Sequence, residues 1–178
     1  PNDLICLSGD LGAAYMGLHL LEREKRACGG QPDPKPKFEG HEYILGRQLK
    51  PEARTDIIER LAEAGIVPTS MIDITDGLAS ETLHLCKSSG CGARIYLDRL
   101  PIARQTHDMA EELHADPVVA ALNGGQDYEL LFTVPLSKQQ EIFALGVDVI
   151  GHVTAAGTGA MLVTPDGSEI ALKAPGWK

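Results

Sequence analysis

The sequence has few aromatic side chains and no excess of positive charge. One Trp, 4 Tyr and 3 Phe are spread over 178 residues, too few to build a platform on which nucleic-acid bases would stack. Its 25 acidic residues outnumber 16 basic ones and give a formal net charge of -9. The basic residues form no cluster that would attract a phosphate backbone. Nucleic acid is therefore not an expected partner.

The chain also lacks C-x-x-C pairs and long apolar runs. Its cysteines, Cys6, Cys28, Cys86 and Cys91, are too few to staple a chain of this length, and we interpret them as reduced thiols. No apolar segment approaches the roughly 18 residues of a membrane span, and the first residues do not resemble a signal peptide. We therefore expect a cytoplasmic protein with no membrane partner.

What is present suits one compact domain over 1–178. Hydrophobic residues make up 43% of the chain, enough to bury a core, and the length is that of a single domain. The sequence opens at Pro1 and runs directly into a strand-like segment, which indicates a piece of a longer protein. Prolines alternate from Pro32 to Pro36 and predict a mobile loop over about 28–40, because proline neither continues a helix nor donates to a sheet.

Apolar spacing and turn residues predict an alternation of strands and helices. Helices dominate the first third, and strand and helix alternate from Thr69 onward, which is typical of an α/β fold. Thr55, Asp116 and Ser137 are expected to cap helices. The expected strands are 3–7, 70–75, 93–98, 128–134 and 147–153, with a hairpin over 160–172; the expected helices are 13–26, 42–49, 55–65, 78–89 and 103–115, with short ones after Asp116 and Ser137.

The stretch IDITDGL, residues 72–78, is the most informative. Its spacing places Asp73 at the end of a strand, and Thr75 and Asp76 in the turn before a helix. Hard cations such as Mg²⁺ take oxygen ligands, and a helix N-terminus favours phosphate, so this pattern suits a magnesium and phosphate site. The spacing fits equally well an alternative in which Thr75 or Asp76 caps the helix and Asp73 is an ordinary acid at a strand end.

Two glycine-containing turns are weaker candidates. In NGGQDYEL, residues 123–130, paired glycines let a backbone approach a ligand closely, although a plain turn between helix and strand is the commoner explanation. The turn from Gly9 to Gly12 precedes the first helix and could hold an anion. It lacks the lysine of a P-loop, so a tight turn is favoured there.

Taken together, several stretches resemble the carboxyl-terminal domain of thiamine-monophosphate kinases, relatives of aminoimidazole ribonucleotide synthetase. They are IDITDGL, the following SETLHLCKSSGCGARIYLDRLPI, the DPVVAALNGGQDYELLFTV block and the terminal GW. The resemblance extends from the first strand to Trp177. It implies an α/β domain whose mixed β-sheet is flanked by helices. It also implies an enzyme that uses ATP and Mg²⁺ to phosphorylate thiamine monophosphate to thiamine diphosphate.

The resemblance also implies roles for individual residues. Asp73 and Asp76 would be catalytic magnesium ligands, and Thr75 would contact ATP. Gln126 would contact the substrate where the family usually has an acidic residue, and Trp177 would occupy an aromatic substrate-contact position.

The family also has an amino-terminal domain, which bears most of the magnesium-binding aspartates and much of a dimer interface. That domain is absent from this chain. The chain alone is therefore expected to be inactive, and the full-length enzyme is expected to be a homodimer.

Two alternatives stay open beside the kinase. One is another ATP-dependent member of the same superfamily, such as an aminoimidazole ribonucleotide or selenophosphate synthetase. The other is a non-catalytic ligand-binding module that keeps the fold. The terminal Gly176-Trp177 and the GG-x-DYEL form favour the kinase over the other enzymes.

Overall fold

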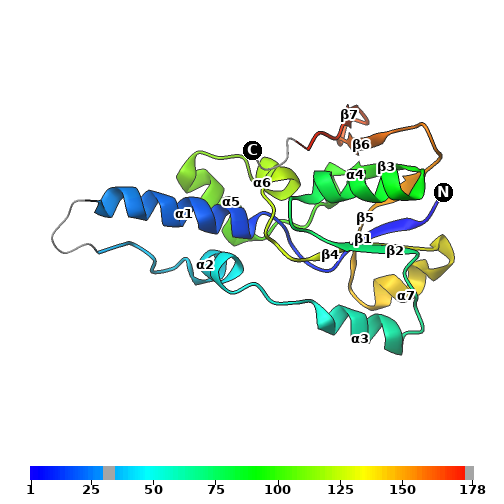
Figure 1. The fold of residues 1–178 in the computed structure, drawn as a ribbon, viewed down its shortest axis with the longest axis horizontal. Helices are drawn as coiled ribbons and strands as arrows, with labels where there is room; N and C mark the ends of the chain where they lie inside the picture. The colour runs from blue at the N-terminus through cyan, green and yellow to red at the C-terminus, as the bar shows by residue number, and fades with distance from the viewer. Residues whose placement is uncertain (30–34, 175–178) are drawn as a thin grey trace.

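A seven-stranded mixed sheet with helices on both faces forms one end of the molecule, and a group of helices forms the other (Figure 1). This computed structural model describes residues 1–29 and 35–174. The α/β architecture expected from the sequence is confirmed. The strands are β1 Leu4–Leu7, β2 Ser70–Asp73, β3 Gly92–Tyr96, β4 Leu130–Val134, β5 Asp148–Thr154, β6 Ala160–Val163 and β7 Glu169–Ala171. The helices are α1 Ala13–Cys28, α2 Glu42–Leu49, α3 Thr55–Glu63, α4 Leu78–Ser89, α5 Arg104–Leu113, α6 Pro117–Asn123 and α7 Gln139–Ala144.

The strand order is β2-β4-β1-β5-β3-β6-β7. β3 pairs with β6 in parallel, and the other pairings found in the described residues are antiparallel. β4 lies between β2 and β1, as its nearly continuous apolar sequence predicts for an interior strand. The expected hairpin over 160–172 is present as β6 and β7.

Side-chain alternation along the strands divides the core between the two faces of the sheet. In β1, Ile5 and Leu7 pack on the face covered by α4 and α6, whereas Leu4 and Cys6 pack on the face covered by α3 and α7. A third cluster joins α1, α2, α5 and α6 around Met16 and fills the helical end. The loop that carries Gln126 therefore lies between two packed elements, α6 and β4.

Several predicted helix ends are confirmed, and two predicted caps are wrong. Gly90 ends α4 with a left-handed φ of 61°, and the Asp116 carboxylate accepts from the Val118 N–H at the start of α6. Thr55 is the first residue of α3, and the cap position belongs to Arg54, with no side-chain cap bond. Ser137 lies in a 3-10 turn, Leu136–Lys138, that precedes α7. Thr55 and Ser137 each lie one residue from the cap position, which is Arg54 for α3 and Lys138 for α7.

The expected loop over 28–40 is only partly described. α1 continues to Cys28, two residues beyond the predicted end, and 35–38 lack helix and strand. Residues 30–34, which hold two of its prolines, lie outside the described part.

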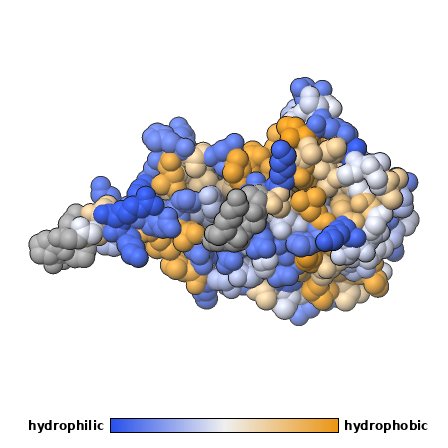
Figure 2. Space-filling model, turned by 45° about the horizontal axis from the view of Figure 1, so that its top comes forward, coloured by the Kyte–Doolittle hydropathy of each residue, from blue (hydrophilic) through white to orange (hydrophobic). Residues whose placement is uncertain are grey.

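On the face seen in Figure 2, apolar side chains gather towards the sheet end, and the tip of the helical end is mostly hydrophilic. Exposed apolar side chains include Val119 on α6 and Ile170 on β7. Within the described residues, no helix combines the length and apolarity needed to cross a membrane.

Candidate functional site

The two motifs singled out in the sequence lie against each other. The Gln126 N–H donates to the Thr75 carbonyl oxygen at 2.8 Å, and the Ile74 N–H donates to the Glu129 carbonyl oxygen at 2.8 Å. A Cβ atom at Gly125 would collide with the Thr75 carbonyl oxygen, and its φ of 69° also favours glycine. Glycine here therefore permits close approach between the two motifs.

Asp73 and Asp76 are exposed carboxylates without partners in the described part of the chain. Asp73 ends β2, and Asp76 lies in the turn before α4. No hydrogen bond or ion pair of either side chain is found among residues 1–29 and 35–174. The helix-cap alternative is wrong for Asp76 and Thr75, because the cap position of α4 is Gly77 and no side chain bonds there. Both carboxylates are left free for a ligand.

Glu81, which the sequence analysis missed, holds the turn that carries Asp76. One of its carboxylate oxygens accepts from the Thr75 N–H at 3.1 Å, the Thr75 hydroxyl at 3.1 Å and the Asp76 N–H at 2.9 Å. Glu81 is only 2% exposed, so these bonds form away from water and fix the turn. Its place in α4 suggests an ordinary helical acid, and only the tertiary contact reveals its role.

Asp76 and Gln126 line one hollow of about 440 Å³, together with Leu18 and Gln48. Gln126 has a φ of 64°, a conformation rare for residues other than glycine. Its side-chain carbonyl accepts from the Tyr128 hydroxyl at 3.1 Å. Two residues predicted from separate motifs thus face the same space. Trp177, the remaining predicted substrate contact, lies outside the described residues.

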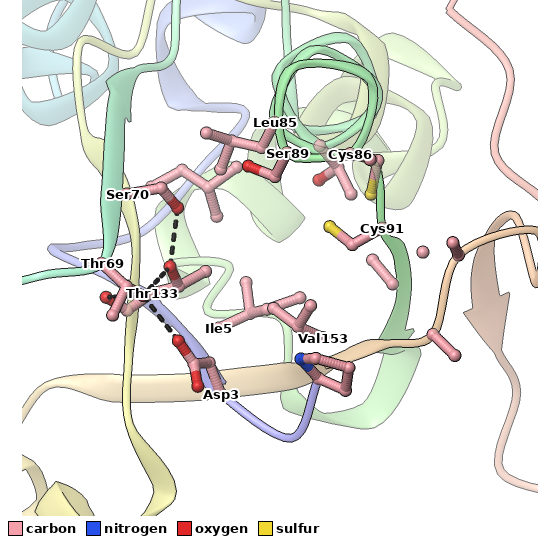
Figure 3. A pocket seen from close by; sticks show the side chains of 18 residues that line it. Asp3, Ile5, Thr69, Ser70, Leu85, Cys86, Ser89, Cys91, Thr133 and Val153 are labelled. Atoms are coloured by element: carbon pink, nitrogen blue, oxygen red, sulfur yellow. Dashed lines mark hydrogen bonds between the residues drawn. The ribbon is translucent and has the colours of Figure 1, made fainter.

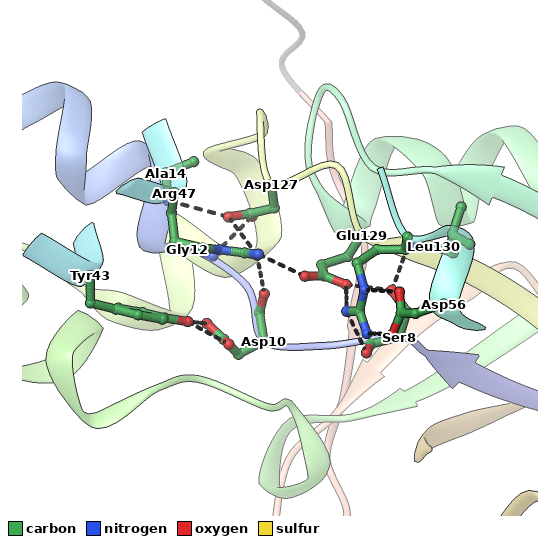
Figure 4. A network of polar contacts seen from close by, with 11 residues as sticks. Ser8, Asp10, Gly12, Ala14, Tyr43, Arg47, Asp56, Asp127, Glu129 and Leu130 are labelled. Atoms are coloured by element: carbon green, nitrogen blue, oxygen red, sulfur yellow. Dashed lines mark hydrogen bonds and ion pairs between the residues drawn. The ribbon is translucent and has the colours of Figure 1, made fainter. Parts of the chain in front are cut away.

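A buried polar network joins the turn after β1 to α2 and to the start of β4 (Figure 4). Glu129, 1% exposed, accepts from Arg47 at 2.8 Å and also from Arg54 and the Ser8 hydroxyl. The Tyr43 hydroxyl donates to the Asp10 carboxylate at 2.6 Å. We call these residues, with Asp127, the polar network. Its acids are already occupied by partners, unlike Asp73 and Asp76.

Asp127 closes the N-terminus of α1. Its carboxylate accepts from the Gly12 N–H at 2.9 Å and the Ala14 N–H at 3.3 Å, which satisfies amides that would otherwise lack partners. Asp127 therefore occupies the two amides that an anion would otherwise use at the end of the Gly9–Gly12 segment. Burial raises the pKa of Asp127 to about 6, although the two amide bonds and Arg47 oppose this shift.

The raised pKa of Asp127 predicts a pH-dependent stability. Because the folded pKa of about 6 exceeds the unfolded value, the folded chain binds this proton more tightly, and the contribution is present at low pH and lost as pH rises through 6. Relative to Asp127→Asn, the wild type should lose about 2 kcal/mol of unfolding free energy between pH 4.5 and 7.5. Denaturant titrations of both proteins across this range would measure it; parallel stability curves would contradict it.

The described residues contain no group of three or more His, Cys, Asp or Glu side chains that could hold a metal ion by themselves. Asp73 and Asp76 have the oxygen donors that Mg²⁺ prefers. They fit a magnesium site as part of its coordination shell. The remaining ligands would have to come from phosphate oxygens, water or protein outside these residues.

The α/β domain thus combines a mixed sheet with two unpaired aspartates, one at the end of β2 and one in the turn after it, and with a glycine loop packed on that turn. Residues 1–164 match the sequence profile described as AIR synthase related protein, C-terminal domain. The chain belongs to this family.

Curated relatives and solved structures agree with that assignment. The thiamine-monophosphate kinases of Aquifex aeolicus and Escherichia coli are 32% and 35% identical over 99% and 100% of this chain. The chain spans about half the length of these relatives, 51% of each. The structure of AaThiL complexed with AMPPCP and TMP superposes with a TM-score of 0.77 and 31% identity, over 99% of this chain and 51% of that one. Escherichia coli HypE, 20% identical with a TM-score of 0.71 over 99% of this chain and 51% of its own, shares the fold.

Proposed function

We propose that this chain is the carboxyl-terminal domain of a thiamine-monophosphate kinase, which transfers the γ-phosphate of ATP to thiamine monophosphate. The observation that carries the proposal is the superposition on AaThiL complexed with AMPPCP and TMP, over nearly the whole of this chain. The curated relatives with that name support the same reaction. A synthetase of the same fold is the second enzymatic candidate, and its support is limited to the fold.

Each site residue has a proposed role in this reaction. Asp73 and Asp76 are the catalytic magnesium ligands, supported by their exposure and lack of partners. Thr75 contacts ATP from the turn that Glu81 holds. Gln126 contacts thiamine monophosphate from the hollow that it shares with Asp76. Trp177 is proposed as a second contact to this substrate.

The chemistry needs positioning more than proton abstraction. A phosphate acceptor has a pKa near ~6 and is largely deprotonated at neutral pH, so no strong general base is required. Magnesium, when bound, would neutralise charge on the phosphates. The chain's own contribution is to orient the carboxylates of Asp73 and Asp76. This orientation would help to align the phosphates of ATP and thiamine monophosphate for in-line transfer.

The other parts of the enzyme belong to the proposal as well. An amino-terminal domain would supply further magnesium ligands, and the full-length enzyme would form a homodimer. A cytoplasmic location is supported by the cysteines, since Cys6, Cys28, Cys86 and Cys91 are all free thiols.

The test compares the full-length protein with the 178-residue chain. Full-length protein supplied with ATP, Mg²⁺ and thiamine monophosphate should form thiamine diphosphate, and the chain alone should form none. Aminoimidazole and selenium substrates serve as controls in the same assay and in thermal-shift measurements. If only one of these stabilised the full-length protein and was turned over, the synthetase would replace the kinase. If the full-length protein turned over none of these substrates, the result would favour the hypothesis of a non-catalytic ligand-binding module.

Gln126→Glu in the full-length enzyme is expected to lower the KM for thiamine monophosphate. A carboxylate attracts the cationic thiazolium, and at a partly solvated site this adds about 1 kcal/mol, or about fivefold. Steady-state kinetics with both substrates would measure it, with the exposed Gln139→Glu as a control for net charge. A clear rise in KM would mean that the neighbours of Gln126 are adapted to a neutral side chain.

A further inference from the structure

A second cavity, of about 420 Å³, lies between the carboxyl-terminal half of α4 and the sheet (Figure 3). Its apolar surface comes from Ile5 and Leu131 on the sheet and from Leu85 on α4. Ile5, Leu85 and Val153 face the open space in the close view. Nothing in the proposed kinase chemistry uses this cavity.

Most of the cavity lies away from the turn that carries Asp76, although Ser70 on β2 and Thr82 on α4 also belong to its lining. Asp76 precedes the first turn of α4, whereas the cavity is lined by the later residues Leu85 and Ser89. A helix of 12 residues is about 18 Å long at ~1.5 Å per residue. The two sites therefore lie towards opposite ends of α4.

One end of the cavity is polar and carries a carboxylate. The Thr69 hydroxyl donates to one Asp3 carboxylate oxygen at 2.6 Å, and Thr133 lies 2.6 Å from the hydroxyls of both Thr69 and Ser70. The other Asp3 oxygen has no partner among the described residues. No Lys, Arg or His belongs to the described residues that line the cavity. Pro1 also lines it, and in the longer protein its nitrogen is an uncharged amide, so there an anionic ligand would meet the Asp3 carboxylate without a compensating cation.

The helical wall carries a polar atom without a partner. Thr82 is 2% exposed, and its hydroxyl oxygen makes no hydrogen bond in the described structure. A buried hydroxyl in this state costs free energy unless a ligand or water satisfies it. Thr82 belongs to the lining of the cavity, but its hydroxyl oxygen is itself inaccessible, so a ligand would supply the missing bond only after the Thr82 side chain rotates.

Two thiols complete the wall at the end of α4. The left-handed Gly90 allows the Cys91 N–H to donate to the Cys86 carbonyl oxygen at 3.0 Å. In this type of helix ending, the side chain three residues before the last helical residue contacts the side chain two residues after it. Here these two side chains are Cys86 and Cys91. Both sulfur atoms face the cavity in Figure 3. The backbone therefore fixes a thiol reporter at the cavity wall.

We propose that this cavity binds a small organic cation, with an apolar body on Ile5, Leu85 and Leu131 and an amine against Asp3. The apolar floor excludes water from the body, and the free carboxylate oxygen accepts from the amine. This site is independent of the kinase reaction. Its test therefore stands whether or not the full-length protein phosphorylates thiamine monophosphate.

The experiment follows alkylation of Cys91 by iodoacetamide in the full-length protein. Burial, with Cys91 nearby, raises the pKa of Cys86. The alkylation rate of each of the two thiols is therefore measured without a probe before Cys91 is used as the reporter. Lys87 places the two cysteines on different tryptic peptides for mass spectrometry. Cys28, at the end of α1, provides an internal control. Three probes of matched size are compared: benzylamine, benzyl alcohol and benzoate.

Benzylamine should slow Cys91 alkylation at lower concentration than benzyl alcohol, and benzoate should give no protection. Asp3→Asn should weaken benzylamine about fivefold and leave benzyl alcohol unchanged. Asp108→Asn, which changes an exposed carboxylate on α5, is the matched control. Equal protection by benzoate, or protection of Cys28 as well, would overturn the proposal. So would a Cys91 that reacts slowly without any probe, because another segment of the full-length protein would then fill the cavity.

Discussion

Replacing Glu129 by alanine is expected to lower the free energy of unfolding by about 3 to 5 kcal/mol. The Glu129 side chain is 2% exposed, and it pairs with Arg47 at 2.8 Å and with Arg54. Both arginine side chains are 21% exposed, so each would lose a counter-charge without full access to water; Arg54 would keep Asp56, and Arg47 would keep Asp127 at 4.0 Å. Ser8 would also lose its acceptor. Denaturant titration of the purified protein would measure the loss.

Two further variants separate the buried charge from other effects of the Glu129 substitution. Glu141→Ala breaks an exposed ion pair with Lys138 and should cost less than about 1 kcal/mol. Glu129→Gln keeps an acceptor but removes the charge, so its cost should fall between the two. If Glu129→Ala cost no more than Glu141→Ala, the polar network would not stabilise the fold.

Local features of the fold follow from the sequence because their causes are local. The turn around Gly167, the left-handed Gly90 and the Asp116 cap each depend on a few adjacent residues. The strand order does not, because β1 pairs with a strand far along the chain: Leu4 lies opposite Val134, and Leu7 lies opposite Leu131. Thr55 and Ser137 were wrong as caps because their hydroxyls are only near the point at which each helix begins.

The candidate site was predictable in its parts and not in its assembly. The sequence identifies the turn with Asp73 and Asp76 and the loop with Gln126, but their contact through Gly125 depends on the tertiary fold. The sequence also cannot distinguish free acids from buried, paired ones. Asp127 precedes a buried strand, so the sequence indicates that its carboxylate needs hydrogen-bond donors. The tertiary packing decides which backbone amides, and which of the 16 basic residues, bind these acids.

If Asp76 binds magnesium in a kinase as proposed, Asp76→Asn in the full-length protein is expected to reduce turnover by at least about 100-fold, because the lost carboxylate would remove charge stabilisation of the transition state. Folding should be nearly unaffected. The Asp76 side chain is exposed and makes no bond in the described structure, and the turn is held through the Asp76 backbone N–H by Glu81, 2.9 Å away. Stopped assays at saturating ATP and thiamine monophosphate would measure turnover, and thermal melts would check the fold.

The magnesium dependence distinguishes a metal ligand from a residue that merely shapes the turn. If Asp76 binds magnesium, the variant should need a higher Mg²⁺ concentration for half-maximal activity, because one anionic donor is lost. Asp98→Asn, at an exposed carboxylate in the 3-10 turn after β3, should change neither turnover nor magnesium requirement. Disruption of the turn instead would lower the melting temperature and leave the magnesium requirement unchanged. Wild-type turnover in Asp76→Asn at every Mg²⁺ concentration would remove Asp76 from the proposed catalytic residues.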